Sequence, residues 1–249
     1  MTGLAFVFGA IFGSFTNVLI HRLPRGESVI LPGSRCRSCG RRLEWWENVP
    51  ILSFLALRGR CRTCDARISP RYLVVEILVA GLFAYCAWRH ALTWEGAACA
   101  VFGVLLVAVF FIDLEHKIIP DRITLPGMAL GLVLSGLRDG PWGMAAGAAA
   151  GLGAGGVLLL IAMASRGGMG GGDVKLAAMM GTFLGWPLIG VGLFAGVLIG
   201  GLVALVLLAT GIKKRKDHIP FGPALAVGGF VAMEWGRQLL RWYLGAFGL

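Results

Sequence analysis

Hydrophobic residues in this chain gather in stretches that are too long for an ordinary helix of a soluble core. Eight stretches carry few or no charges, and they cover residues 4–20, 72–88, 96–112, 123–137, 143–164, 176–186, 188–209 and 219–236. A helix needs about 20 apolar residues to cross the hydrocarbon core of a bilayer. The pattern therefore predicts an all-α polytopic membrane protein with about eight transmembrane helices.

Two of these stretches are short for a crossing. As helices, 123–137 and 176–186 would measure about 16 to 23 Å, against about 30 Å of hydrocarbon. Either the helices extend beyond the stretches or the bilayer is thin beside them. The composition agrees with a membrane protein, because 57% of the residues are hydrophobic, 14% are charged and the mean hydropathy is +0.79.

The basic residues predict which side faces the cytoplasm. Segment 21–71 holds eleven Lys or Arg, loops 114–122 and 166–175 hold two each, and 213–216 adds four, which makes nineteen of twenty-three. The remaining four are Arg89, Arg138, Arg237 and Arg241. Positive residues collect in cytoplasmic loops. We therefore expect these three loops and segment 21–71 to face the cytoplasm.

The same distribution bears on the first stretch and on the partners. No Lys or Arg precedes the stretch 4–20, whereas basic residues follow it directly, which is the reverse of a secretory signal. We expect a retained anchor with its N-terminus outside.

The net charge of +10 is explained by topology and by affinity for anionic membrane lipid, so nucleic acid is not an expected partner.

Segment 21–71 is the one soluble segment of any size, and it is too short to bury much of a core. It contains two C-x-x-C pairs, Cys36 with Cys39 and Cys61 with Cys64. Four thiolates at this spacing suit a tetrahedral zinc, which supplies folding free energy to a small module. Gly40 and Asp65 follow the pairs, where a tight turn closes. A redox dithiol or disulfides are the alternatives, and the cytoplasmic placement disfavours stable disulfides.

Three other features suggest packing or structural roles. Cys86 and Cys99 lie in crossings, and we expect small buried apolar residues there. Glu76 lies inside the second crossing, where it pairs with an arginine such as Arg71 or belongs to a methyl-transfer pocket; the structural role is favoured. The glycines that permit close helix packing are Gly147, Gly151, Gly153, Gly155 and Gly156.

Two aspartates stand at crossing ends. Asp113 ends the third crossing and Asp173 begins the sixth. Since the chain crosses out and back between them, both return to the same face at similar depth. Two carboxylates held close in a partly desolvated site cannot both ionise easily, so one keeps a proton while the other acts as a general base toward water. This is the chemistry of aspartyl proteases.

The residues before Asp173 support that interpretation. Gly167, Gly168, Gly170, Gly171 and Gly172 remove side-chain bulk, so an extended substrate backbone can approach. A phosphate cradle is an alternative, but the G-x-x-x-x-G-K-[ST] spacing is absent and Asp173 repels an anion. A second alternative makes each aspartate a helix cap or an interfacial charge. Lys175 either tunes the catalytic carboxylate or extends to the surface.

The chain resembles the type IV prepilin peptidases, which are GxGD-type intramembrane aspartyl proteases, from end to end. The matching motifs are Gly13-Ser14-Phe15-Thr16-Asn17-Val18, Arg22-Leu23-Pro24, the two C-x-x-C pairs, Leu57-Arg58-Gly59-Arg60-Cys61, Ile68-Ser69-Pro70-Arg71-Tyr72, Asp113, Pro120-Asp121, Gly168-Met169-Gly170-Gly171-Gly172-Asp173-Val174-Lys175 and Pro220-Phe221-Gly222-Pro223. The G-x-G-D signature is specific in this setting.

This resemblance implies an enzyme of the bacterial inner membrane that removes the basic leader from prepilins or type II secretion pseudopilins. It also implies methylation of the new N-terminal residue with S-adenosylmethionine, at an unknown cofactor site. The catalytic aspartates fall on Asp113 and Asp173, with Gly170, Gly172 and Lys175 in support and Asp121 capping or orienting the following helix. The expected division is a first anchor at 1–20, a zinc module with the methyltransferase part at 21–71, and a seven-helix peptidase domain at 72–249.

Two other classes of function compete with the peptidase. A small proton-coupled transporter with a zinc regulatory module would also need paired intramembrane acids. The lack of inverted hydropathy repeats and the position of both acids at the membrane edge disfavour it. A non-catalytic scaffold for pilus assembly would show no leader removal.

Overall fold

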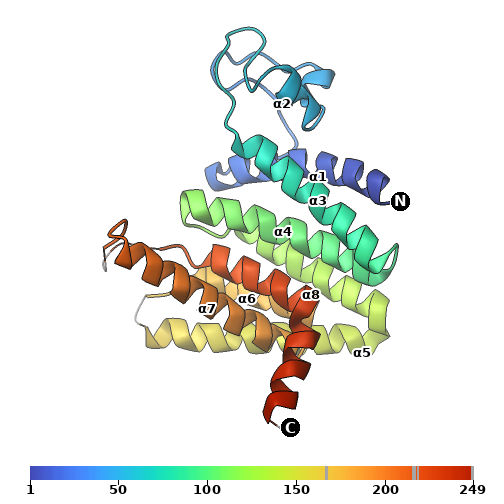
Figure 1. Cartoon of the computed structure of the whole chain (residues 1–249), viewed down its shortest axis with the longest axis vertical. Helices are drawn as coiled ribbons and strands as arrows, with labels where there is room; N and C mark the ends of the chain where they lie inside the picture. Colours follow the sequence, from blue (N-terminus) through green and yellow to red (C-terminus); the bar gives the residue numbers. More distant parts are fainter. Residues whose placement is uncertain (166–167, 215–216, 218, 248–249) are drawn as a thin grey trace. The chain divides into compact units, whose positions relative to one another are not determined.

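The computed structural model describes residues 1–165, 168–214, 217 and 219–247 (Figure 1). These residues form helices and connecting loops, with two isolated antiparallel β-bridges and no strand among them. The predicted all-α fold class is therefore confirmed. Arg166, Gly167, Arg215 and Lys216, which enter the charge count or the glycine run, lie outside the described residues.

Five helices in the described part of the chain are long and apolar enough to cross a membrane. They are Thr2–Arg25, which joins α1 (Thr2–Arg22) to the short η1 (Leu23–Arg25), α3 (Arg71–His90), α4 (Trp94–His116), α5 (Asp121–Ala164) and α7 (Leu188–Ala209). Two further helices, α6 (Gly171–Leu184) and α8 (Gly222–Phe247), fall outside these criteria.

All eight predicted stretches overlap helices, and α5 contains two of them. Gly140 interrupts α5 with a non-helical backbone (φ 69°) directly before Pro141, so 123–137 and 143–164 lie on either side of a kink. The helices of the two short stretches also begin before the predicted limits, although α6 ends at Leu184, two residues before its predicted end. The first part of α5 runs from Asp121 to the kink, about 28 Å, and α6 begins five residues before residue 176 and measures about 21 Å.

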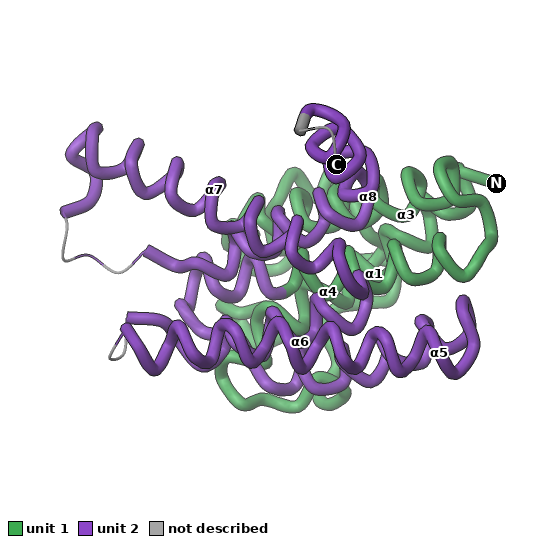
Figure 2. The backbone as a smooth tube through the Cα atoms, turned by 90° about the horizontal axis from the view of Figure 1, so that it is seen from below, with its two compact units in different colours: residues 1–108 green, residues 109–249 purple. Residues whose placement is uncertain are grey.

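The chain divides into two compact units, Met1–Ala108 and Val109–Leu249, with the boundary inside α4 (Figure 2). In the first unit α1 packs against α3 through two glycines one turn apart. A Cβ added at Gly9 would lie 2.7 Å from the carbonyl oxygen of Val79, and one at Gly13 would lie 2.7 Å from the Cα of Glu76. Only glycine permits this approach of the two backbones.

The prediction for Cys86 and Cys99 requires a correction. Both side chains are buried as expected, but the two residues are joined as a disulfide between α3 and α4. Cys86 lies four residues before the end of α3 and Cys99 five residues after the start of α4, so the disulfide links the two helices close to their connection. Sequence alone treated them as separate apolar residues because nothing in their spacing indicates a pair.

In the second unit α5 packs against α6 along a row of glycines. Added Cβ atoms at Gly147, Gly151 and Gly155 would lie 2.9 to 3.1 Å from α6 atoms, whereas at Gly153 and Gly156 they would meet nothing within 4 Å. The packing role is therefore confirmed for the three glycines at four-residue spacing, which share one helix face. The Ser135 hydroxyl adds a bond of 2.8 Å to the Thr182 carbonyl oxygen.

Candidate active site and metal centre

Two turns of identical pattern bring the four cysteines together. In the first turn the N–H of Cys36 donates to Arg41 O, and the N–H of Gly40 donates to Cys36 O. In the second turn the N–H of Cys61 donates to Ala66 O, and the N–H of Asp65 donates to Cys61 O. Gly40 (φ 72°) and Asp65 (φ 55°) both adopt the left-handed conformation that closes each turn. The knuckle turns predicted at these two positions are therefore confirmed.

The four sulfur atoms fit a tetrahedral metal ion. All four Sγ atoms lie within 4.8 Å of one another, and those of Cys36 and Cys64 are 3.7 Å apart. Zinc–sulfur bonds of about 2.3 Å place two tetrahedral ligands about 3.8 Å apart. All four are free thiols, so the structure does not form the alternative disulfides.

The electrostatics of the cluster also favour a cation. The backbone N–H groups of Cys64 and Thr63 donate to the Cys61 sulfur and lower its pKa to about 6. The Ala66 N–H acts in the same direction on Cys64, but burial and the neighbouring thiols outweigh it and raise the pKa to about 11. Four thiolates therefore cannot coexist here unless a positive ion offsets their repulsion.

Ionic contacts stiffen the loop between the cysteine pairs. Arg41 donates to Glu47 at 2.6 Å, and Glu47 also accepts the Glu44 N–H at 2.8 Å, which closes a capping box on η2 (Trp45–Asn48). The Arg41 bond is the main reason why the pKa of Glu47 is lowered. The loop is thus ordered by charge and backbone bonds where a hydrophobic core is lacking.

Glu76, on α3, connects the cysteine module at 21–71 to α1 and α3. Its carboxylate is buried and accepts the backbone N–H of Ile51 at 2.7 Å, and the Ser14 side chain also bonds to it. Ile51 precedes α2 (Leu52–Ala56) and holds a positive φ of 64°, which is unfavourable for a β-branched residue. These contacts give Glu76 the structural role favoured from sequence, with backbone and hydroxyl partners.

Asp113 lies in the last turn of α4 and is 5% exposed. Lys117, with φ 56°, ends the helix directly after it, and the Lys117 N–H bonds to Asp113 O. The Asp113 Oδ2 accepts the N–H of Gly222 at 2.9 Å. Because Gly222 is the first residue of α8, its N–H has no acceptor within that helix and is available to the carboxylate.

Asp173 lies in the first turn of α6. Gly170 precedes the helix, and a Cβ added there would lie 3.4 Å from Asp173 Oδ2. One at Gly172 would lie 2.9 Å from the Cβ of Ile119. The two glycines thus leave space beside the carboxylate and allow the α6 terminus to approach the α4–α5 connection.

Ile119 links the surroundings of the two aspartates. It contacts Gly172 at the α6 N-terminus, and its Cδ1 lies 3.1 Å from the position of a Cβ on Gly222, which bonds to Asp113. The N-termini of α6 and α8 therefore converge on one apolar residue, and each presents its positive end to a carboxylate. Sequence reasoning assigned no role to Ile119 or Gly222. The motif Pro220-Phe221-Gly222-Pro223 could have indicated a helix start at Gly222, with a free backbone N–H for a carboxylate.

Asp121 and Lys175 form an ion pair between α5 and α6, with Lys175 Nζ 2.7 Å from both carboxylate oxygens. Asp121 was expected to cap or orient the following helix, and the capping part of this expectation is wrong. Pro120 occupies the N-cap position and no side chain caps the helix, while Asp121 lies in its first turn. Lys175 bonds to Asp121 in this arrangement, so the pair fixes the α5 and α6 N-termini relative to each other.

Two family models match most of the chain. The Bacterial Peptidase A24 N-terminal domain matches residues 7–90, and the Type IV leader peptidase family matches residues 100–205. The chain belongs to the type IV leader peptidase family. The resemblance stated from the sequence motifs is therefore confirmed.

Relatives from three organisms extend this assignment to almost the whole chain, and each is named prepilin leader peptidase/N-methyltransferase. The protein of Stutzerimonas stutzeri is 35% identical over 96% of this chain and 92% of its own length. That of Bacillus subtilis (strain 168) is 37% identical over 98% of both. That of Myxococcus xanthus (strain DK1622) is 44% identical over 88% of this chain and 67% of its own. None of the three relatives is named as a transporter. No solved structure matches this chain.

Proposed function

We propose that this chain removes the leader peptide from prepilins or pseudopilins and then methylates the new N-terminal residue, with S-adenosylmethionine as the methyl donor. Family membership and the names of the relatives support both activities. The observation that carries the peptidase assignment is the convergence of α6 and α8 on Ile119, which brings the Asp173 helix terminus to the partner of Asp113.

In the proposed mechanism the two carboxyl groups share one proton. One carboxylate removes a proton from a water molecule, which attacks the scissile carbonyl carbon, and the other carboxyl group protonates the departing amine. The helix N-termini beside Asp113 and Asp173 stabilise the negative charge that remains on the pair. The proton pattern belongs to the pair and is not divided between the two residues.

The residues around the aspartates would position them and admit the substrate. Gly170 leaves open the side of Asp173 where an extended peptide backbone could lie, and Gly172 permits the contact with Ile119. Lys175 and Asp121 hold the α5 and α6 N-termini in register. We assign these four residues a positioning role and keep the proton transfers for Asp113 and Asp173.

The four cysteines would hold a structural zinc ion. When bound, zinc supplies folding free energy and takes no part in the proton transfers, because four thiolates fill its coordination. We assign the methyl-transfer part to the module at 21–71, between the anchor 1–20 and the peptidase domain 72–249.

The chain is a protein of the bacterial inner membrane, and we infer that the cysteine module and both aspartates face the cytoplasm. The nineteen basic residues on that side support this orientation. A prepilin anchored by its apolar segment would leave its basic leader in the cytoplasm, with the scissile bond at the membrane boundary. Enzyme and substrate would then meet without unfolding of a buried helix.

Purified protein in detergent, incubated with a prepilin and S-adenosylmethionine, tests the proposal. The product mass should fall by that of the leader and rise by that of one methyl group. Leader removal without the methyl group would overturn the second activity alone. A substrate of unchanged mass would favour a non-catalytic scaffold for pilus assembly.

A further inference from the structure

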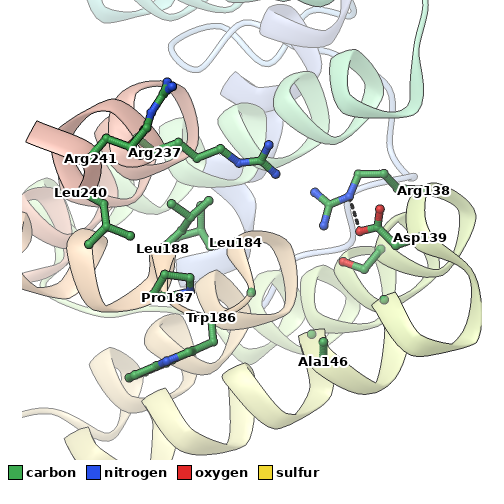
Figure 3. Close-up of a pocket in the computed structure, with 14 residues that line it drawn as sticks. Arg138, Asp139, Ala146, Leu184, Trp186, Pro187, Leu188, Arg237, Leu240 and Arg241 are labelled. Atoms are coloured by element: carbon green, nitrogen blue, oxygen red, sulfur yellow. Dashed lines mark hydrogen bonds and ion pairs between the residues drawn. The ribbon is translucent and has the colours of Figure 1, made fainter. Parts of the chain in front are cut away.

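A second site lies in unit 2, at the far ends of the helices that begin beside the aspartates. A cavity of about 580 Å³ is lined by α5 near its kink, by the α6–α7 connection and by α8 (Figure 3). Along α8, Arg237 lies about 22 Å from Gly222, the partner of Asp113. Along α6, Leu184 lies about 16 Å from Asp173. The cavity is therefore separate from the proposed catalytic site.

The cavity gathers three of the four basic residues that fall outside the basic side of the chain. Arg138, Arg237 and Arg241 line it together with one acid, Asp139. Arg138 bonds to Asp139 at 2.7 Å, which leaves two positive charges without a counter-ion in the cavity. Basic residues are rare on this side of the chain, so their collection in one cavity indicates a specific role.

The guanidinium groups are arranged for an anion. Arg138 and Arg237 point toward one another from α5 and α8 across the cavity (Figure 3). Within the described part of the chain the Arg237 guanidinium has no ion pair or hydrogen bond, and Arg241 donates only to the Arg237 carbonyl oxygen at 3.3 Å. Like charges that converge repel one another unless an anion lies between them.

The surroundings place this anion at a membrane interface. Trp186 lines the cavity, and Trp142 and Trp242 are next to lining residues in the chain. The three side chains are 74 to 85% exposed. Exposed tryptophans at the ends of membrane helices and in the adjoining loops mark the level of the lipid headgroups. Leu184, Leu188 and Leu240 supply an apolar wall beside the arginines.

We propose that this cavity binds the headgroup phosphate of an anionic phospholipid between Arg138 and Arg237, with Arg241 adding positive charge beside it and an acyl chain along the leucines. Arginine binds phosphate oxygens in bidentate fashion, and its charge is permanent. The two excess positive charges select a lipid with net negative charge over a zwitterionic one. This site does not depend on the proposed peptidase activity.

Delipidated protein in detergent can be titrated with phosphatidylglycerol while bound lipid is counted by native mass spectrometry. The substitution Arg237→Gln should weaken binding about 10-fold or more, because a charge-assisted hydrogen bond is lost. Arg241→Gln should weaken it several-fold, because one positive charge of the cavity is lost. Arg89→Gln is the matched control, since Arg89 lies outside the cavity and should bind like wild type. Equal affinity in all four proteins would overturn the proposal.

Two further binding measurements, with phosphatidylcholine and with inorganic phosphate, identify the ligand. Phosphatidylcholine carries the same phosphate without net charge and should bind at least about 10-fold more weakly. Inorganic phosphate alone, at the same concentration as the phosphatidylglycerol, should not protect the protein from thermal unfolding. Equal binding of phosphatidylcholine, or equal protection by inorganic phosphate, would each rule out an anionic-lipid site.

A measurement on the unaltered protein covers the case in which the variants fail to fold. A phosphatidylglycerol with a photoreactive group near its headgroup should cross-link to the peptides that contain Trp186 and Leu240. Excess unlabelled phosphatidylglycerol should suppress this cross-link. Cross-links confined to other helices would contradict the assignment.

Discussion

The Asp113 carboxylate accepts the backbone N–H of Gly222, 109 residues further along the chain, at 2.9 Å. A Cβ at Gly222 would lie 2.6 Å from Asp113 Oδ2, so a methyl group there must displace the carboxylate. We expect Gly222→Ala to reduce leader cleavage by about 100-fold, because small displacements of a reacting group have effects of this size. The measurement is kcat on a purified prepilin.

Gly245→Ala is the control for this substitution on the same helix. A Cβ at Gly245 would meet nothing within 4 Å, and that variant should cleave like wild type. Full activity of Gly222→Ala, in a protein that unfolds at the wild-type temperature, would mean that the Asp113–Gly222 bond does not position the carboxylate.

The Lys175–Asp121 pair gives a prediction of smaller size. Both side chains are about half exposed, and such pairs contribute little to stability, typically below about 1 kcal/mol. We expect Lys175→Gln to reduce cleavage several-fold without a change in unfolding temperature. The double exchange Asp121→Lys with Lys175→Asp should restore part of the rate. If the exchange is as slow as complete removal of the pair, Lys175 acts on the chemistry and not on helix register.

The helices and the cysteine cluster could be predicted because their signals are local. Apolar runs and C-x-x-C spacing need no knowledge of distant residues. The predicted limits of α6 and α8 were less accurate. Charged residues interrupt the apolar stretch but not the helix: Asp173 and Lys175 lie within α6, and Arg237 and Arg241 lie within α8. Charged residues at helix ends are tolerated where they reach an interface or a cavity.

Long-range pairs could not be predicted in the same way. The Cys86–Cys99 bond and the Asp113–Gly222 bond depend on which helices are neighbours. The predicted topology placed both aspartates at the same face of the membrane. No sequence pattern, however, identifies Ile119 as the residue that contacts the helix starts beside both aspartates. Its contacts follow from two glycines on other helices, Gly172, which the sequence analysis described only as a position without side-chain bulk, and Gly222, to which it assigned no role.

Metal analysis tests the cysteine cluster. We expect one zinc ion per chain in protein purified without chelator, and loss of that ion in Cys61→Ser, because three thiolates bind zinc more weakly than four. Thr63→Ala keeps all four thiols and the backbone N–H groups, so it should retain the metal. Methyl transfer should fall with zinc loss more than cleavage does. Metal-free wild-type protein with an intact module would contradict this.

Thiol counting tests the disulfide between α3 and α4. Of the six cysteines, Cys86 and Cys99 are bonded and the other four are free. Denatured protein treated with chelator and an alkylating reagent should therefore gain four labels before reduction and six after it. Six labels without reduction would show that Cys86 and Cys99 are separate thiols. In the orientation that we propose, this pair lies near the helix ends on the oxidising side of the membrane, where disulfides persist.

The most direct test of the proposed mechanism is leader cleavage by Asp113→Asn and Asp173→Asn, measured from the product mass with purified enzyme and prepilin. Each substitution should reduce the rate by at least about 100-fold, because the pair needs both carboxyl groups to accept a proton from water and to donate one to the departing amine. Glu27→Gln, which changes an exposed carboxyl group outside both proposed sites, should cleave like wild type. Near wild-type cleavage by either of the first two variants would contradict the assignment of these aspartates as the catalytic pair.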